Sequence, residues 1–140
     1  MQTLYTAQAT AVGGRDGHVE TADGLLKVDM SMPKSLGGPG RPQTTNPEQL
    51  FAMGYAACFG GAVGFVAKMQ KIEVGAIAVT ADVHIGKVEP AGLGLGVALS
   101  VRVPGVSREV AEGLVRAAHE VCPYSKATRG NIEVTLAVID

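Results

Sequence analysis

The two cysteines of this 140-residue sequence are the residues best suited to chemistry. Cys58 lies inside a long uncharged segment, and Cys122 lies at the end of a second predicted helix much further along the chain. They do not form a Cys-x-x-Cys pair, so a thioredoxin-type site is excluded. Free cysteine is among the most buried residue types, and two structural thiols therefore remain an alternative to a redox pair.

Local electrostatics favours different roles for the two sulfurs. Cys122 is expected at a helix C-terminus, where the helix dipole disfavours a thiolate, and this suits a resolving thiol that reacts with an oxidised sulfur. Cys58 needs a nearby cation to become a thiolate in apolar surroundings. Arg15, on a glycine-rich turn, is the best candidate, and we expect Glu48 to orient its guanidinium by a bidentate contact. Each charged residue is also compatible with an ordinary solvated position.

Other chemistries find little support. His119 and Cys122 are three positions apart on a predicted helix, but no second clustered pair exists to complete a zinc site, so no metal is expected. His18 and His84 are expected at the surface. No nucleophile elbow, phosphate loop or dinucleotide fingerprint is present. The formal net charge is −1 without a basic stripe, which argues against a nucleic-acid partner.

The uncharged segment begins with strong helix-start chemistry. Asn46 is a capping residue, Pro47 suits the first helical position, and Gln49 is expected to close a capping box. The helix is expected to run to about Lys71. Residues 50–67 carry no charge but are rich in Gly and Ala, which predicts a helix buried on all sides rather than a membrane span. In so small a protein, a second subunit is expected to help cover it.

Alternating apolar residues predict a largely β-rich remainder. Strands are expected over 5–11, 26–32, 77–85, 93–103 and 132–138, with turns at 13–17 and 89–92. Ser107 is expected to cap a second helix, with Val110, Leu114, Ala118 and Cys122 on its apolar stripe and Pro123 at its end. This order predicts a single α+β domain over residues 1–140, with antiparallel sheets and two main helices. The N-terminus lacks the features of a secretory signal, which indicates the cytoplasm.

Two segments resemble the signatures of a known superfamily. Residues 45–59, Thr-Asn-Pro-Glu-Gln-Leu-Phe-Ala-Met-Gly-Tyr-Ala-Ala-Cys-Phe, resemble the first signature of the OsmC/Ohr superfamily. Val-Cys-Pro-Tyr-Ser at 121–125, with Arg-Gly-Asn at 129–131, resembles the second. The second segment is more similar to the organic hydroperoxide resistance (Ohr) branch than to the OsmC branch. The order of strands and helices resembles the family over nearly the whole chain.

The resemblance implies an intertwined homodimer that works as a cofactor-free, two-cysteine peroxidase in oxidative-stress defence. Cys58 matches the peroxidatic cysteine and Cys122 the resolving cysteine, with an intrachain disulfide between them in the cycle. Glu48 and Arg15 match the active-site glutamate and arginine of the family. Organic hydroperoxides are the implied substrates, and dihydrolipoyl proteins are the implied dithiol reductants.

Apolar side chains near Cys58 are expected to favour alkyl or lipid peroxides over hydrogen peroxide, and Phe59, Met53 and Phe65 are the candidates. A redox-sensing or binding module that oxidises without turnover remains an alternative. A hydrolase using Cys58 is disfavoured, because no histidine has an evident position as its base.

The spacing of Glu48 and Cys58 raises a question about the subunit that supplies each residue. On one straight helix, ten positions separate them by about 15 Å along the axis. An arginine that touches both groups therefore requires either a break in the helix near Gly54 or a Glu48 from the partner subunit, with or without Arg15 from that partner. We favour the partner, because the uncharged helix already requires a second chain.

Overall fold

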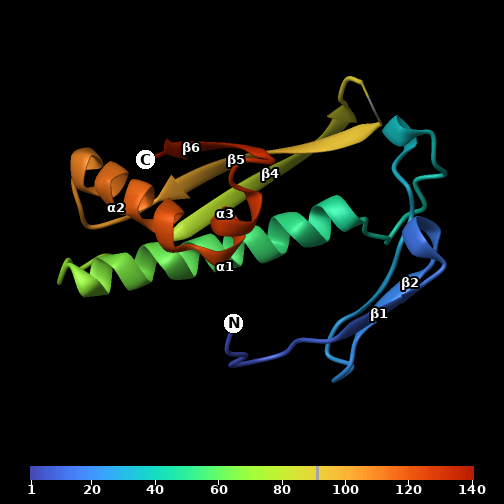
Figure 1. The fold of residues 1–140 in the computed structure, drawn as a ribbon, viewed down its shortest axis with the longest axis horizontal. Coiled ribbons are helices and arrows are strands. Elements are labelled where there is room, and N and C mark those ends of the chain that lie inside the picture. The colour runs from blue at the N-terminus through green and yellow to red at the C-terminus, as the bar shows by residue number, and fades with distance from the viewer. Residues whose placement is uncertain (91) are drawn as a thin grey trace. The chain divides into compact units, whose positions relative to one another are not determined.

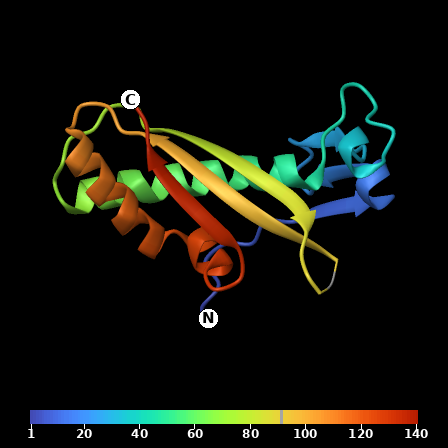
Figure 2. The same ribbon diagram turned by 90° about the horizontal axis from the view of Figure 1, so that it is seen from above.

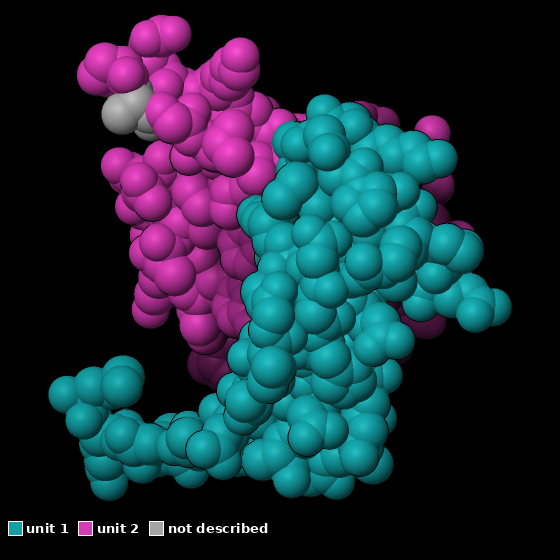
Figure 3. All heavy atoms as spheres, turned by 90° about the vertical axis from the view of Figure 1, so that its right-hand side faces the viewer, with its two compact units in different colours: residues 1–50 teal, residues 51–140 magenta. Residues whose placement is uncertain are grey.

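The structure, a computed structural model, describes residues 1–90 and 92–140 (Figure 1). The chain forms two compact units, Met1–Leu50 and Phe51–Asp140, which are coloured separately in Figure 3. The hairpin turn predicted at 89–92 includes Ala91, which lies outside the described residues. The prediction of one domain over the whole chain stays a prediction.

The first unit contains a small antiparallel sheet in the order β1-β2-β3. Its strands are β1 (Ala9–Val12), β2 (His18–Thr21) and β3 (Lys27–Asp29). β1 begins later than predicted, and β2 was missed because its four residues are too short to establish an alternating pattern. The strand predicted over 26–32 ends early, and Met30 instead forms an isolated bridge with Thr45.

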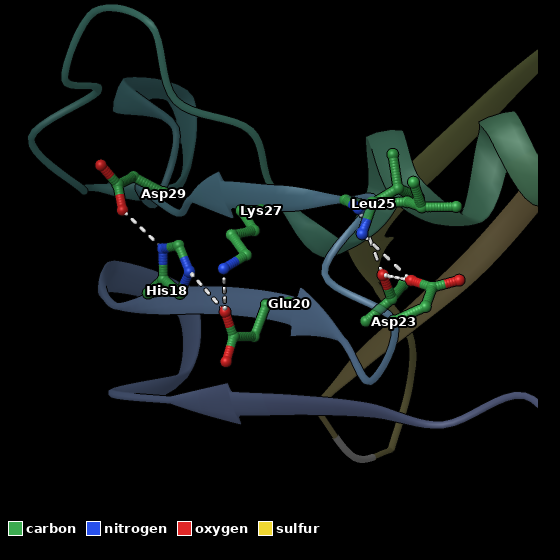
Figure 4. A network of polar contacts seen from close by, with 8 residues as sticks. His18, Glu20, Asp23, Leu25, Lys27 and Asp29 are labelled. Carbon is green, nitrogen blue, oxygen red and sulfur yellow. Dashed lines mark hydrogen bonds and ion pairs between the residues drawn. The ribbon is translucent and has the colours of Figure 1, made fainter.

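Polar side chains connect β2 and β3 across the sheet (Figure 4). The Nδ1 atom of His18 lies 2.8 Å from the Asp29 carboxylate, and the Lys27 ammonium lies 3.6 Å from the carboxylate of Glu20. His18 is the first residue of β2. Since all four side chains are well exposed, these ion pairs contribute little to stability.

The second unit contains a mixed sheet in the order β4-β5-β6. Its strands are β4 (Ala78–Lys87), β5 (Leu93–Arg102) and β6 (Glu133–Val138). β4 and β5 pair antiparallel over ten residue pairs, as their alternation predicted. β5 and β6 pair in parallel, which corrects the expectation of purely antiparallel sheets. A parallel pair needs a long crossover, which the helices between these two strands provide.

Helix α1 (Pro47–Met69) begins where the sequence predicts. The Asn46 side chain accepts a hydrogen bond of 2.9 Å from the Gln49 backbone N–H, as a cap should. The Gln49 side chain does not close the predicted capping box. It accepts instead from the Thr45 hydroxyl at 2.8 Å. The helix is unbroken at Gly54, so the alternative of a break there is wrong.

The core of the second unit lies between the sheet and the two long helices, α1 and α2 (Arg108–Val121). Figure 2 shows the strands of this sheet lying over α1. Alternate residues of β5 point into it, and Val97, Leu99 and Val101 are buried. Full burial of each such side chain contributes about 1.5–3 kcal/mol. The apolar stripe of α2 differs from the prediction at one position: Val110 is 37% exposed, and Ala111 is buried in its place.

A short helix, α3 (Pro123–Thr128), follows α2 directly. Pro123 ends α2 as predicted, but it is also the first residue of this further helix, a position that its fixed φ angle favours. Cys122 lies at the junction, as the C-cap of α2 and the N-cap of α3. The junction therefore fixes the backbone of Cys122 from both sides.

One side of α1 remains uncovered in the single chain. Exposed, uncharged residues follow one another at four-residue spacing along the helix, and we call them the α1 ridge: Met53, Ala57, Gly61, Phe65 and Met69. One chain alone does not bury the helix on all sides, and the expected cover by a second subunit stays a prediction. α1 is long and apolar enough to cross a membrane by length and composition, as the core helix of a water-soluble protein also can be. Its opposite side, including Tyr55 and Val63, is fully buried in the core.

Candidate active site

The two cysteines meet in the second unit, where α1 passes the junction of α2 and α3. The Cys122 thiol points toward the Cys58 sulfur at an Sγ–Sγ distance of 3.5 Å, and both residues are free thiols. A disulfide requires the sulfurs to approach to about 2.0 Å, so they need to move together by about 1.5 Å. The geometry is therefore that of two reduced thiols in direct contact within one chain.

The surroundings of Cys58 disfavour its thiolate. Partial burial raises the pKa of the Cys58 thiol, and the hydrogen bond and charge of Cys122 raise it further. The backbone N–H of Tyr124 opposes this by donating toward the Cys58 sulfur, which lowers the pKa. A cation beside the sulfur is the remaining means of favouring the thiolate.

Exposure distinguishes the two sulfurs. Cys122 is fully buried, with 0% of its surface exposed, whereas Cys58 is half-buried. A molecule arriving from solvent therefore meets Cys58 first, as expected if Cys58 is the attacking sulfur and Cys122 the resolving one.

Aromatic rings of α1 and α3 pack against one another in the second unit. Tyr124 stacks on Phe51 with a ring-centroid distance of 6.1 Å and lies 5.7 Å from the ring of Tyr55. Gly54 allows this approach, because a Cβ atom there would lie 3.1 Å from the Tyr124 hydroxyl oxygen. Cys58 itself is partly buried and packs against the hydrophobic core of this unit.

A buried polar network next to the cysteines was missed by the sequence analysis. The Tyr55 hydroxyl lies 3.0 Å from the Ser125 hydroxyl and 3.2 Å from that of Thr128. The Ser125 oxygen also lies 2.9 Å from Nδ1 of His119. Burial lowers the pKa of His119, and the charge of Arg129 lowers it further. In the sequence, the one feature that could have indicated this network is spacing: Tyr55 precedes Cys58 by three positions, and Ser125 follows Cys122 by three.

In the first unit, Arg15 and Glu48 form the expected bidentate contact. The guanidinium donates to both carboxylate oxygens, at 2.9 and 2.6 Å. The hydrogen bond from Arg15 holds the pKa of Glu48 below its ordinary value, and the same contact raises the pKa of Arg15. Glu48 lies in the first turn of α1, where the helix dipole favours a carboxylate. Glu48 therefore holds the Arg15 guanidinium in one orientation.

The turn that carries Arg15 requires glycine. Gly13 has a φ of 80°, in the left-handed region, and a Cβ atom on Gly17 would lie 1.7 Å from the Val12 carbonyl oxygen. Between them, Gly14–Asp16 forms a single 3₁₀ turn. Glycines on either side thus let the chain reverse tightly and present the arginine.

The three residues predicted to bind substrate occupy different environments. Phe59 is fully buried, and its ring packs edge-on against Tyr55. Met53 and Phe65 belong to the α1 ridge and are 63% and 57% exposed. Phe65 lies two turns after Cys58, on nearly the same face of the helix as Cys58. Met53 lies five positions before Cys58, and its side chain projects from a different face than that of Cys58. A role in substrate binding stays a prediction for all three.

Within residues 1–90 and 92–140, no group of three or more His, Cys, Asp or Glu side chains is placed to hold a metal ion. His119, which the sequence places three positions before Cys122, uses its Nδ1 atom for the Ser125 hydroxyl.

Comparison with known proteins identifies the family. The model of a family described as OsmC-like protein matches residues 38–137, a range that contains α1, both cysteines and Glu48. The chain belongs to the OsmC-like family.

Relatives and solved structures place the chain within this family. An organic hydroperoxide resistance protein of Xanthomonas axonopodis pv. citri is 49% identical over 138 residues, which cover 98% of this chain and 96% of that protein. OhrA of Bacillus subtilis is 49% identical and covers 99% of both. A crystal structure of an organic hydroperoxide resistance protein from Legionella pneumophila is 52% identical, with a TM-score of 0.93, over 99% of this chain and 100% of that one. The chain thus lies in the Ohr branch of the OsmC-like family, and its α+β fold is confirmed.

Proposed function

We propose that this protein is a thiol-dependent peroxidase that reduces organic hydroperoxides to alcohols in oxidative-stress defence. The observation that carries the proposal is the approach of the Cys58 and Cys122 sulfurs to 3.5 Å in an otherwise apolar setting. The names of the relatives in Xanthomonas and Bacillus, which are organic hydroperoxide resistance proteins, support the substrate class.

The reaction uses sulfur chemistry alone. The Cys58 thiolate attacks the distal oxygen of the hydroperoxide, the O–O bond breaks, and the alkoxide leaves as an alcohol after taking up a proton. Cys58 is then a sulfenic acid. The Cys122 thiol attacks this sulfur, water leaves, and a disulfide forms. An external dithiol reduces the disulfide by two exchange steps and becomes a disulfide itself.

Arg15 supplies the cation that the Cys58 thiolate requires, and Glu48 holds the guanidinium in place. Burial of Cys58 supports this role, because it raises the pKa of the thiol. Glu48 and Cys58 stand ten positions apart on the unbroken helix α1, or about 15 Å along its axis. We therefore assign the Arg15–Glu48 pair beside each Cys58 to the partner subunit of a homodimer.

The α1 ridge supports such a dimer. Its residues are uncharged, and Met53, Phe65 and Met69 are each more than half exposed in the single chain. Helices approach closely where small residues such as Ala57 and Gly61 lie between larger ones. A second copy covering this ridge removes the apolar surface from water and brings a second chain against α1, the helix that carries Cys58.

Dihydrolipoyl groups are the proposed reductant, and the cytoplasm is the proposed location. A lipoyl dithiol closes a five-membered ring when it is oxidised, so its second exchange step is intramolecular and fast. Two free thiols at this distance also fit a reducing compartment. No cofactor is required by the reaction as written.

A redox-sensing module that oxidises without turnover is the second candidate. The specific observation in its favour is that the resolving sulfur is fully buried, which slows any reductant that has to attack Cys122. Turnover distinguishes the two proposals, because a sensor consumes one equivalent of peroxide per site and then stops.

Consumption of cumene hydroperoxide with dihydrolipoamide tests the function directly. We expect many turnovers with this pair, and much slower turnover with hydrogen peroxide or with glutathione as reductant. One equivalent consumed per chain, with every reductant tried, would support the sensor and refute the peroxidase.

Subunit complementation tests the shared site. Glu48→Ala and Cys58→Ser proteins are each expected to be weak or inactive, and heterodimers formed by mixing them should regain one intact site. Mixing two different batches of Cys58→Ser protein is the matched control. Absence of rescue, with subunit exchange confirmed by mass spectrometry, would mean that one chain builds each site.

A further inference from the structure

The buried hydroxyl network lies one helical turn away from the sulfur pair on both of its supporting segments. Tyr55 is three positions before Cys58 on α1, and Ser125 is three positions after Cys122 on α3. Their hydroxyls meet at 3.0 Å, in the same way that the two sulfurs meet at 3.5 Å. Two side-chain contacts thus connect α1 with the segment around α3: one between hydroxyl oxygens and one between sulfurs.

The oxygen contact belongs to a chain of polar groups that is closed to solvent. Tyr55 and Ser125 have no exposed surface, and Thr128 is 3% exposed. The Thr128 hydroxyl donates to the carbonyl oxygens of Tyr124 and Ser125 at 3.1 Å, while His119 meets Ser125 from α2. In the described part of the chain, every buried side-chain nitrogen and oxygen has a partner. A fully satisfied buried network of this kind restricts its elements to one arrangement.

The resolving step needs such restriction. After Cys58 is oxidised, the Cys122 sulfur has to close a gap of about 1.5 Å along a direct line to the oxidised sulfur. Small errors in the position of a reacting group slow a reaction strongly. Because Cys122 lies at the junction of two helices, its position depends on how α3 is held against α1.

We propose that Tyr55 and Ser125 are positioning residues that hold the Cys122 sulfur against Cys58 and so set how often the sulfenic acid resolves rather than overoxidises. This inference rests on the proposed peroxidase function and deepens it. His119 and Thr128 complete the network by orienting the Ser125 and Tyr55 hydroxyls.

Two reactions compete for the same sulfenic acid. In the first, the Cys122 thiol attacks the Cys58 sulfur, an S–S bond forms, and the hydroxyl leaves as water. In the second, the sulfenic acid reduces another hydroperoxide, taking one oxygen atom to become a sulfinic acid while an alcohol forms. Only the first is reversible by thiols. The ratio of the two products at a given peroxide concentration therefore measures how well Cys122 is positioned.

Tyr55→Phe is the sharpest test, because it removes one hydroxyl and keeps the ring that packs in the core. Ser125→Ala removes the other partner. Tyr5→Phe is the matched control, since it makes the same chemical change at a residue that is 82% exposed. Circular dichroism and thermal melting check that each variant is folded.

Two rates are measured separately in reduced protein treated with cumene hydroperoxide. Oxidation of Cys58 is followed by stopped-flow fluorescence or peroxide loss, and the disulfide and sulfinic acid are quantified by mass spectrometry after rapid quenching. We expect Tyr55→Phe to form the disulfide about tenfold more slowly, a factor that corresponds to about 1.4 kcal/mol. The ratio of sulfinic acid to disulfide should rise about tenfold, while the rate of Cys58 oxidation stays within about twofold.

Three other outcomes have distinct meanings. Disulfide formation at the wild-type rate in both Tyr55→Phe and Ser125→Ala overturns the inference. Equal slowing of both steps also overturns it, because that result indicates general damage rather than positioning of Cys122. Failure of the wild-type protein to form any Cys58–Cys122 disulfide with peroxide refutes the proposed function itself, which this experiment thereby distinguishes.

Discussion

Removing one cysteine at a time allows the reactivity of the remaining sulfur to be measured on its own. In Cys122→Ser protein, a disulfide reagent reaches Cys58 directly, because Cys58 is half-buried in the native fold. In Cys58→Ser protein, the reagent reaches Cys122 only after the junction of α2 and α3 opens, since Cys122 has no exposed surface. We therefore expect the buried thiol to react much more slowly.

The size of the difference follows from the hydrogen bonds that opening breaks. The Cys122 N–H bonds to the Ala118 carbonyl at 2.9 Å, and the Lys126 N–H bonds to the Cys122 carbonyl at 3.0 Å. The Ser125 hydroxyl bonds to Tyr55 at 3.0 Å. At about 1 kcal/mol each, these three bonds give an opening cost of about 3 kcal/mol. That cost reduces the reaction rate of Cys122 on the order of a hundredfold.

Stopped-flow reaction with 5,5′-dithiobis(2-nitrobenzoate) provides the assay. The two variants are compared at the high-pH plateau of each rate profile, where both thiols are ionised and differences in pKa no longer contribute. Both variants in guanidinium chloride serve as the control, because the unfolded thiols should react at similar rates.

Equal native rates for the two variants would refute the reasoning, because they would show that Cys122 is as accessible as Cys58. The expected result has a consequence for turnover. A reductant would attack the Cys58 sulfur of the disulfide and release Cys122 as the thiolate. A trapped mixed disulfide should then be found on Cys58.

Three further outcomes are expected from the same site. Cys58→Ser should abolish peroxide consumption, whereas Cys122→Ser should consume about one equivalent of peroxide before it stops or overoxidises. Peroxide loss and mass spectrometry measure both results. Near-normal turnover in Cys58→Ser would contradict the assigned roles. Arg15→Ala should slow oxidation and raise the pKa of Cys58, followed by the pH dependence of thiol alkylation; an unchanged rate and titration would remove Arg15 from the site. The folded-state pKa of Glu48 lies below its ordinary value of 4.5, so its stabilising contribution is complete above pH 4.5 and is lost as the pH falls through the lowered value. Because water screens an Arg15 side chain that is 35% exposed, we expect Glu48→Gln to lower the free energy of unfolding by only about 1 kcal/mol at pH 7, and by less in acid. Denaturant unfolding at several pH values measures this difference. A difference that grows as the pH falls would contradict the expected sign.

The sequence by itself determined those features that depend on neighbouring residues. The start of α1 was predictable because Asn46 and Pro47 act on the backbone within one helical turn. The pairing of β4 with β5 was predictable because their side chains alternate with a period of two over ten residues each. The two signatures around Cys58 and Cys122 were likewise continuous segments, and they identified the family before any contact was known.

Local sequence patterns did not predict the structure where more than one arrangement of the chain is compatible with the same pattern. The alternation of β6 is compatible with either strand direction, and only the crossover through α2 and α3 made its pairing with β5 parallel. The uncharged segment of α1 gave no indication of which side the chain covers. That side was decided by the sheet and α2, which bury Tyr55 and Phe59 and leave Met53 and Phe65 exposed.

The tertiary structure alone decided the contacts that make a site. Arg15 and Glu48 are 33 positions apart, the two cysteines 64, and Tyr55 and Ser125 70. Sequence analysis named four of these six residues by their chemistry. It found neither Tyr55 nor Ser125, because their spacing of three positions from a cysteine has meaning only once the two segments are known to pack together. Their contact arises from packing: a hydroxyl that is buried in the core has to find a hydrogen-bond partner, and these two meet one turn away from the sulfurs.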